Sequence, residues 1–492
     1  MALSGPIMKT IKRVAKNTSF LFAGDIVVRL LGLLLVVSIA RELGAGEYGK
    51  YAFAIAFTSL FLILADLGLS TISTRDIARD SKLAPSYVTT VPLIKLVFSI
   101  AAMGLIAIII NALEYPPDTV KVVYIVGLLY TLESFGAFYR SIFRAFERME
   151  YDAVSIITER LLVVGAGLVF LFHDSRLIVV VLAMLAAQAF GFVFTISLCT
   201  VKFTRPKLPP DLSIVKPLIK TAIPFALAGV FDRIVFQTDL IMLSTMKGDI
   251  VAGWYGVAQR PLFAILFIPS IITAAIFPAI SKFAVSSNEN LSVAYEKSLK
   301  FLTLLATPIC IGTIMISHRI ILFLYGEGFI NSEIVLKILA FAVAILFLVI
   351  FTGHTLVSIN RQIIAMRVSG IGALLNVALN FGLIPAMSYV GAAIASAVSV
   401  TIILVIQFVY LQKHLCNVNL PKLVAKPLLA AVIMGILVYL LDKRLSVTTV
   451  NLLLIIGVAI IIYGLQLLLL QVLDKREVGS IKEIFRRKDP NS

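Results

Sequence analysis

The chain has 492 residues and a formal net charge of +16, with 60% hydrophobic and only 14% charged residues. Soluble domains carry about 25% charged residues, so this composition, with a mean hydropathy of +1.02, excludes an ordinary soluble enzyme or binding domain. Long apolar runs separated by short polar turns indicate a polytopic membrane protein. Backbone groups in lipid must be hydrogen-bonded within the span, and the runs are too long for barrel strands, so an all-α fold is predicted.

In chain order, the apolar runs predict about fourteen transmembrane helices. The first six cover residues 18–40, 49–69, 88–111, 120–143, 153–172 and 177–201. The next six cover 218–246, 251–280, 299–317, 333–359, 362–386 and 390–411, and the last two cover 423–441 and 447–472. The first run is too long for a signal peptide, so we expect it to be an uncleaved span. Pro261, Pro269 and Pro278 should kink or break the eighth span.

The charges predict the orientation. Of the 43 Lys and Arg residues, about 29 fall on the N-terminal side of the predicted membrane, about 9 on the other side and about 5 within spans. The positive-inside rule then places both termini in the cytoplasm of a multi-pass cell-membrane protein. The basic loops are expected to contact anionic membrane lipid, and nucleic-acid binding is not predicted.

The longest polar connection divides the chain. The predicted domains are a six-helix lobe at 1–201, a cytoplasmic linker at 202–216, a second six-helix lobe at 217–412, two additional helices at 413–473 and a basic cytoplasmic tail at 474–492. Short matches link the two lobes: the motif at 20–24 resembles that at 225–229, and Tyr48-Gly49 resembles Tyr255-Gly256. A duplicated unit with an even number of spans predicts a pseudo-two-fold axis along the membrane normal.

Sequence motifs for soluble catalysis are missing. The three cysteines are scattered, which predicts neither a disulfide framework nor a zinc site. The G-x-G-x-x-G pattern at 44–49 follows a membrane helix rather than a strand, so it does not indicate dinucleotide binding. No Walker A, H-E-x-x-H or G-x-S-x-G pattern occurs. We therefore predict no catalytic residues, no metal site and no enzyme.

Ionisable residues inside the spans are the most informative feature. They are Asp25, Arg29, Lys95, Glu133, Glu159, Arg160, Asp232, Arg233, Asp239 and Arg260. Facing lipid, each would cost ~2.5–3.5 kcal/mol, or ~25–35 kcal/mol together. A fold has only ~5–15 kcal/mol of net stability. Most of these side chains must therefore face the bundle interior or a wet cavity.

Several of these residues have a structural alternative. Asp25 and Arg29 are spaced i, i+4, so they form either a structural ion pair or a cavity pair. Glu159 and Arg160 are adjacent and point about 100° apart, so they need separate partners. Lys95 either reaches the cytoplasmic interface or faces inward.

The eleventh and eighth spans also carry polar side chains. Asn376 and Asn380 form an i, i+4 amide pair, for which hydrogen bonding between helices is expected. Arg260 lies beside Gln259 a few residues inside its span, where a cavity role is favoured.

A motif series near the N-terminus resembles a known family. Its members are Asn-Thr-Ser-Phe-Leu-Phe-Ala-Gly at 17–24, Ala-Arg-Glu-Leu-Gly at 40–44, Tyr-Gly-Lys-Tyr at 48–51, Ala-Asp-Leu-Gly at 65–68 and Arg-Asp-Ile-Ala-Arg at 75–79. The series is similar to the oligosaccharide flippase branch of the multidrug/oligosaccharidyl-lipid/polysaccharide exporter superfamily. The resemblance implies two six-helix lobes around a central cavity, alternating access, and sugars carried on a polyprenyl phosphate or pyrophosphate as substrate.

The resemblance also suggests site residues. Arg-Leu-Leu-Gly at 29–32 resembles the first-span motif of the lipid II flippases, whose arginine binds the anionic head group. Their second-span arginine has no clear counterpart here, and Lys95 is the substitute considered. The predicted substrate-binding residues are Arg29, Lys95, Arg233, Gln259 and Arg260. The predicted coupling or cavity residues are Asp25, Glu133, Glu159, Arg160, Asp232, Asp239, Asn376 and Asn380.

No cofactor is expected apart from coupling to H⁺ or Na⁺, with Asp25, Glu133 and Asp239 as candidates. The expected partners are a lipid-linked oligosaccharide, membrane lipid and glycan-assembly enzymes, and the chain is expected to be a monomer. The main alternative is a cation-coupled multidrug antiporter, which would favour an acidic cavity. A membrane polymerase or ligase would need a large outer loop, and a scaffold would not need so many buried charges.

Overall fold

The computed structural model describes the backbone of residues 5–416 and 418–472 and the side chains of residues 24–223, 229–416 and 418–472. Every regular element in these residues is helical, which confirms the all-α prediction. The predicted basic tail at 474–492 and most side chains of the motifs at 20–24 and 225–229 lie outside the described residues.

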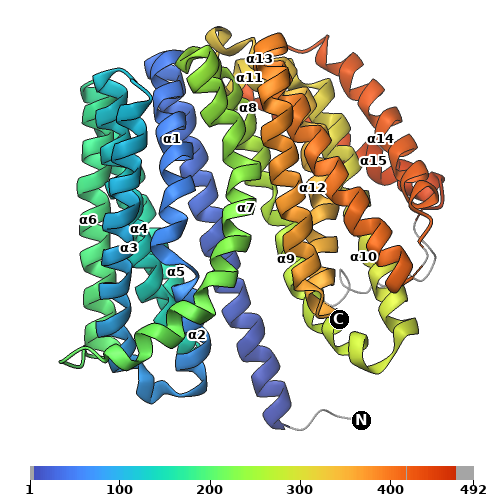
Figure 1. Cartoon of the computed structure of the whole chain (residues 1–492). Coiled ribbons are helices and arrows are strands. Elements are labelled where there is room, and N and C mark those ends of the chain that lie inside the picture. Colours follow the sequence, from blue (N-terminus) through green and yellow to red (C-terminus); the bar gives the residue numbers. More distant parts are fainter. Residues whose placement is uncertain (1–4, 417, 473–492) are drawn as a thin grey trace, which may run out of the picture. The chain divides into compact units, whose positions relative to one another are not determined.

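The helices follow the predicted apolar runs closely (Figure 1). The first half of the chain contains α1 (Gly5–Asp66), α2 (Leu69–Arg79), η1 (Ser81–Leu83), α3 (Ala84–Ala112), α4 (Pro117–Ala145), α5 (Met149–His173) and α6 (Leu177–Lys202). After it come η2 (Leu212–Ile214), α7 (Val215–Lys247), α8 (Asp249–Ile265), α9 (Phe267–Ser286), α10 (Asn288–Met315), α11 (Ser317–Tyr325), η3 (Glu327–Phe329), α12 (Ser332–Ser358), α13 (Gln362–His414), α14 (Leu420–Asp442) and α15 (Thr449–Leu469). Among the described residues, 11 helical segments are long and apolar enough to cross a membrane.

Two of these helical segments each contain two predicted spans. The α1 helix is interrupted at Gly44, whose φ of 76° and ψ of 179° are readily accessible only to glycine. The α13 helix is interrupted at Ser388, with φ 54° and ψ −134°, three residues after Pro385. These interruptions separate predicted spans 18–40 from 49–69 and 362–386 from 390–411. The total of fourteen spans stays a prediction.

The break between α8 and α9 follows from proline chemistry. Pro269 has no N–H to donate to the carbonyl of Ile265, and its ring crowds that carbonyl. Accordingly α8 ends at Ile265, and the Leu266 N–H donates to the nearer carbonyl of Phe263 at 3.2 Å. The predicted interruption of the eighth span is confirmed.

The helices group into two compact units, which are described separately. Unit 1 contains Met1–Phe267 and Ser369–Ser396, and unit 2 contains Ile268–Val368 and Ala397–Ser492. In unit 1, α1 packs against α3, α4, α5, α7 and α8. In unit 2, α10 packs against α12 and α14, and α14 packs against α15. The lobes predicted at 1–201 and 217–412 stay a prediction.

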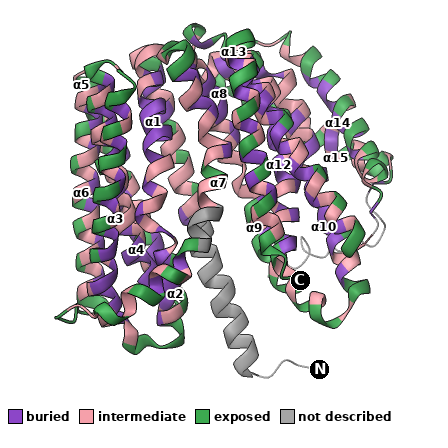
Figure 2. Cartoon of the chain, viewed as in Figure 1, coloured by how far each residue is buried: buried purple, intermediate pink, exposed green. Residues whose placement is uncertain are grey.

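Burial is distributed as a membrane helix requires (Figure 2). On α3, Leu96, Val97 and Ile108 are exposed, whereas Lys95 and Ser99 on the other face are buried. An exposed apolar face opposite a buried polar one indicates that the exposed face contacts lipid. The polar side chains of α3 are therefore directed into the protein.

An arginine ties the additional helices to the rest of unit 2. Arg319 of α11 is buried, and its guanidinium donates to the carboxylate of Asp442 at the end of α14. It also donates to the backbone carbonyls of Asp442 at 2.8 Å and Leu445 at 2.6 Å. These carbonyls belong to the helix end and the turn before α15, where they have no helical partner.

Candidate functional site

The candidate site in unit 1 begins with Arg29 on α1. Its Nε lies 2.8 Å from Oδ2 of Asp25, so the predicted i, i+4 ion pair is present. The two side chains are 36% and 46% exposed, respectively. Arg29 also donates through Nη1 to the carbonyl of Phe263 at 3.4 Å, near the end of α8. The pair thus holds α1 to α8 while remaining accessible.

A second cation, Arg260 of α8, lies among tyrosines. The phenols of Tyr48, Tyr51 and Tyr130 lie within electrostatic range of its guanidinium. Tyr48 and Tyr51 come from α1 and Tyr130 from α4. Phenols at neutral pH carry no charge. These three neighbours of Arg260 are therefore neutral at physiological pH.

Two further arginines lie within electrostatic range of Tyr130, namely Arg160 of α5 and Arg233 of α7. Arg160 lies 3.8 Å from Glu133. Arg233 and its neighbour Asp232 are exposed. We call Arg160, Arg233, Arg260, Tyr48, Tyr51 and Tyr130 the arginine–tyrosine cluster. It brings together residues of five helices of unit 1, namely α1, α4, α5, α7 and α8. The planar guanidinium groups of its arginines match the geometry of phosphate oxygens.

Lys95 lies elsewhere. Its side chain is 0% exposed and forms an ion pair with Asp66 of α1. It also donates to Ser134 at 2.9 Å, and the Asp66 carboxylate accepts from Ser70 at 2.6 Å. Lys95 therefore does not reach the interface. Gln259 is also buried and donates to the carbonyl of Phe236 at 3.2 Å.

Glu159 belongs to a buried network inside the α4–α5–α6 bundle. It accepts hydrogen bonds from Arg140 and Gln188. Arg140 also lies 3.9 Å from Asp152, which is bound by Arg144 at 2.9 Å. Glu159 and Arg160 thus have separate partners, as their angular spacing requires. This network stabilises the bundle. The sequence predicted only Glu159 as a member of it, because Arg140 and Asp152 were not singled out.

A buried carboxylate lies between α7, α8 and α13. Asp239 is 0% exposed and accepts hydrogen bonds from Tyr255 at 2.5 Å, Asn376 at 3.0 Å and Asn380 at 2.7 Å, and also from Ser396. All four donors are neutral. We call these five residues the Asp239 cluster. The hydrogen bonds of Asn376 and Asn380 across helices confirm the expected role of this amide pair.

One oxygen atom of the Asp239 cluster lacks a hydrogen bond. The Oδ1 of Asn380 is buried and has no hydrogen-bond partner among the described residues. Carboxylate, amide and hydroxyl oxygens are the ligands of hard cations. A buried carboxylate without a counter-charge is costly. The cluster therefore has the composition expected of a site for a small monovalent cation.

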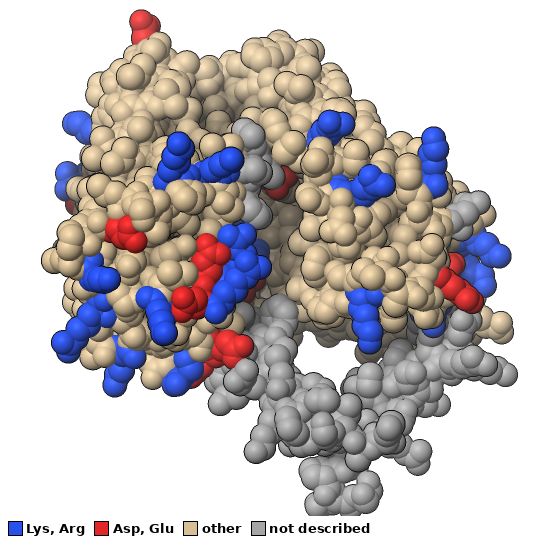
Figure 3. Space-filling view, turned by 60° about the horizontal axis from the view of Figure 1, so that its bottom comes forward, with Lys and Arg blue, Asp and Glu red and all other residues tan. Residues whose placement is uncertain are grey.

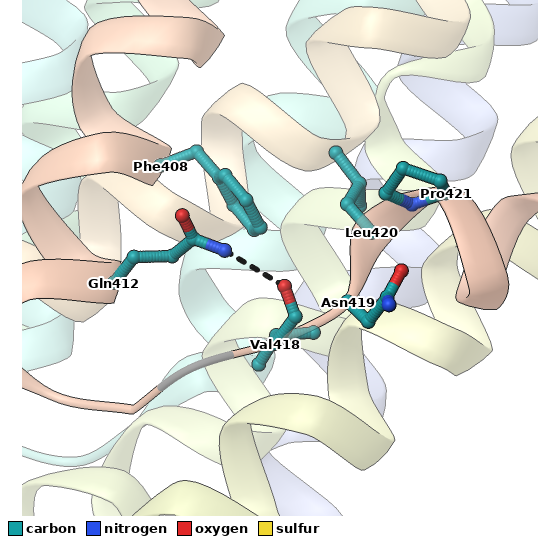
Figure 4. A pocket seen from close by; sticks show the side chains of 6 residues that line it. All are labelled: Phe408, Gln412, Val418, Asn419, Leu420 and Pro421. Carbon is teal, nitrogen blue, oxygen red and sulfur yellow. Dashed lines mark hydrogen bonds between the residues drawn. The ribbon is translucent and has the colours of Figure 1, made fainter.

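A pocket of about 470 Å³ lies in unit 2 where α13 meets α14 (Figure 4). It is lined by Phe408, Gln412, Val418, Asn419, Leu420 and Pro421. Gln412 donates to the carbonyl of Val418 at 2.8 Å across it. None of these lining residues carries a charge, and none was predicted as a site residue, so this pocket is not included in the candidate site.

Comparisons with known proteins agree with this architecture. A model of the family described as polysaccharide biosynthesis protein matches residues 14–284. The probable low-salt glycan biosynthesis flippase Agl15 of Haloferax volcanii is 23% identical over 401 residues, which cover 81% of this chain and 83% of the relative. The structure of the lipid II flippase MurJ in an inward closed conformation has a TM-score of 0.73 at 17% identity and covers 90% of this chain and 97% of its own. The structure of an inward-facing multidrug resistance MATE family transporter has a TM-score of 0.64 at 15% identity and covers 79% of this chain and 98% of its own.

Proposed function

Because the chain belongs to the polysaccharide biosynthesis protein family, we propose that it is a flippase that moves lipid-linked oligosaccharide across the cell membrane. The proposal depends most on Arg260, a cation of the helix bundle that has the neutral phenols of Tyr48, Tyr51 and Tyr130 within electrostatic range. A polyprenyl phosphate or pyrophosphate supplies the anion that such a group requires. The name of the Haloferax relative, a glycan biosynthesis flippase, supports the same substrate class.

In the proposed mechanism the arginines hold the phosphate of the substrate. Arg29, Arg233 and Arg260 bind its oxygens through their planar guanidinium groups. The tyrosine hydroxyls offer hydrogen bonds to the sugars, and the prenyl tail remains in lipid. Lys95 is left out of this group because its ammonium is already bound to Asp66. Transport requires no covalent chemistry from any of these residues.

The proposal includes an orientation with both termini in the cytoplasm. One end of unit 1 carries α2 and the polar linker, and its exposed cations include Arg75, Arg79, Lys82, Arg148, Lys202, Arg205 and Lys207. Figure 3 is turned so that this end comes forward, with Lys and Arg side chains spread over it. The positive-inside rule favours this end on the cytoplasmic side. The opposite end, with Gly44 and Gly248, is then external.

We further propose that Na⁺ binding at the Asp239 cluster drives the cycle. Moving an anionic lipid against its gradient needs a source of free energy. A cation supplies it when one conformation binds the cation more tightly than the other. The buried carboxylate, the two amides and the unpartnered Oδ1 of Asn380 support this location. The cell-membrane location, monomeric state and glycan-assembly partners are parts of the same proposal.

A flipping assay tests the proposal. The chain is reconstituted in proteoliposomes with a short polyprenyl pyrophosphate carrying a fluorescent sugar, and accessibility of the sugar to an added quencher is followed. Arg29→Ala should abolish flipping with little change in Tm, because the Arg29–Asp25 pair is partly exposed and such pairs contribute about 0–1 kcal/mol. Arg29→Lys should recover part of the rate, since the charge remains but the bidentate fork is lost.

Arg176→Gln is the matched control, because Arg176 also pairs with a nearby carboxylate, Asp174, in an exposed loop. It should flip like the wild type. Normal flipping by Arg29→Ala would contradict the proposed phosphate contact. Uptake of a fluorescent cationic drug, with no movement of the lipid, would instead favour the multidrug antiporter.

A further inference from the structure

Helices α1 and α8 meet backbone to backbone at one end of unit 1. A Cβ on Gly49 would lie 1.8 Å from the carbonyl oxygen of Asp249. A Cβ on Gly253 would lie 2.1 Å from the carbonyl oxygen of Ala45. Neither position accepts any side chain without separating the helices. We call this the glycine contact, and under the proposed orientation it closes the external end of unit 1.

Both glycines belong to the same repeated sequence. Ala-Gly-Glu-Tyr-Gly occupies 45–49 on α1, and Ala-Gly-Trp-Tyr-Gly occupies 252–256 on α8. In each copy the tyrosine is buried, but its hydroxyl faces a different group. Tyr48 faces the cation Arg260, whereas Tyr255 donates to the carboxylate of Asp239 at 2.5 Å. The contact is therefore connected to the arginine–tyrosine cluster on one side and to the Asp239 cluster on the other.

Tyr255 has little freedom to move independently of α8. Gly253 and Gly256, on either side of it, pack on α1, with a Cβ on Gly256 falling 3.2 Å from the Tyr48 ring. Its neighbour Trp254 packs edge-on against Tyr389 of α13, with ring centroids 5.7 Å apart. A displacement of the Tyr255 ring is therefore passed to the backbone of α8 at the glycine contact.

We propose that Tyr255 is a positioning residue that transmits cation binding at the Asp239 cluster to the glycine contact. The inference rests on the proposed cation coupling. A Na⁺ ion on the Asp239 oxygens competes with the Tyr255 hydroxyl for the same lone pairs. The phenol then turns its own oxygen toward the ion or withdraws from the cluster. Either movement shifts α8, so Na⁺ favours separation of α1 from α8.

The test follows the glycine contact by cross-linking. Gly46→Cys and Ile250→Cys are introduced after replacement of the three native cysteines, because a Cβ on Gly46 would lie 3.6 Å from the Ile250 side chain. Disulfide formation is measured in proteoliposomes in NaCl and in N-methyl-D-glucamine chloride of equal ionic strength. In the otherwise unchanged chain, Na⁺ should lower the cross-linking rate by about fivefold or more, within the usual range of coupling between sites.

Tyr255→Phe removes only the hydroxyl and should cross-link at the same rate in both salts, while ²²Na⁺ binding is retained. Tyr48→Phe, the equivalent change in the other repeat, should keep the Na⁺ response. A Na⁺ response that persists in Tyr255→Phe would overturn the inference while leaving the cation site in place. Absence of ²²Na⁺ binding in the unchanged chain would refute the proposed coupling site, and the inference with it.

Discussion

Arg29 and Lys95 are both cations within membrane helices, but their surroundings differ. Arg29 is partly exposed beside an equally accessible carboxylate. Lys95 is fully enclosed, and its ion pair with Asp66 is supported by Ser134. Water screens the second pair less, because only its Asp66 side chain is exposed, at 31%. The free energy of removing one partner therefore differs between the two pairs. We therefore propose a role in transport for Arg29 and a role in stability for Lys95.

Replacing Lys95 should destabilise the protein. Lys95→Met leaves the Asp66 carboxylate without its counter-charge, and breaking a buried pair costs up to ~3–5 kcal/mol. We expect a lower Tm in detergent for the single variant and partial recovery for Lys95→Met combined with Asp66→Asn. Lys207→Met in the exposed linker is the control. An unchanged Tm for the single variant would show that the pair contributes nothing to stability.

Replacing Asp239 should have the opposite effect on stability. Asp239→Asn removes an uncompensated buried charge, so Tm should rise in Na⁺-free buffer. The same change should remove the dependence of flipping on an imposed Na⁺ gradient, measured in proteoliposomes. Asp232→Asn, two turns earlier on α7 and exposed, should retain the gradient response. A retained response in Asp239→Asn would place the coupling site elsewhere.

At the residue scale, the sequence identifies charges more readily than their partners. Asp66 and Arg140 lie inside predicted spans, so the rule that in-span charges need partners already applied to them. Which charged and polar groups meet depends on which helices pack side by side. Asp239 and Asn376, for example, are 137 positions apart in the chain. Hydropathy does not specify that adjacency. Tyr255 carries no charge, and nothing in its local sequence indicates a carboxylate partner.

At the scale of helices, the glycine contact gives a direct test of how close α1 and α8 must come. Gly253→Ala should force them apart, because its Cβ would overlap the Ala45 carbonyl. We expect the cross-link between Gly46→Cys and Ile250→Cys to be largely lost. Gly165→Ala on α5 is the control, since nothing lies within 4 Å of its Cβ and alanine favours helix by about 1 kcal/mol. Undiminished cross-linking in Gly253→Ala would contradict the contact.

The ends of the helices show which local sequence signals are sufficient to predict a helix boundary. The prolines correctly predicted the break between α8 and α9, because a missing N–H removes a hydrogen bond of the helix itself. Gly44 marks the turn inside α1 because glycine, which has no Cβ, readily adopts its φ of 76° and ψ of 179°. Ser388 is different, since a serine with positive φ is uncommon and must be held by its surroundings. Local sequence cannot supply that tertiary constraint.

At the scale of the whole molecule, the orientation is open to direct measurement. Lys207 lies in the linker and Arg176 in the loop between α5 and α6, and both are exposed. With single cysteines at these sites, an impermeant maleimide should label Arg176→Cys in intact cells. Lys207→Cys should be labelled only after the membrane is opened. The reverse pattern would invert the proposed topology and place the glycine contact on the cytoplasmic side.

The family and the all-helical membrane architecture followed from the sequence, because composition and the motif series at 17–79 are properties of the chain itself. The match to residues 14–284 confirms that family resemblance. The division of helices among units was harder to predict, since residues 369–396 join the first unit although they lie between the two segments of the second unit in sequence. The assignment of residues 369–396 to the first unit depends on packing between helices that are distant in sequence.

The buried ion pair of Lys95 also bears on how the nascent chain enters the bilayer. A lysine near the centre of a helix opposes insertion by ~2.5–3.5 kcal/mol, which several leucines are needed to offset. Asp66 precedes Lys95 by 29 residues, so the ribosome synthesises the carboxylate first. We therefore expect α3 to insert into the membrane with the counter-charge of Lys95 already present. A gene split between α2 and α3, with the second fragment made first, would deprive α3 of that help. We therefore expect the order of the helices along the chain to favour insertion of α3.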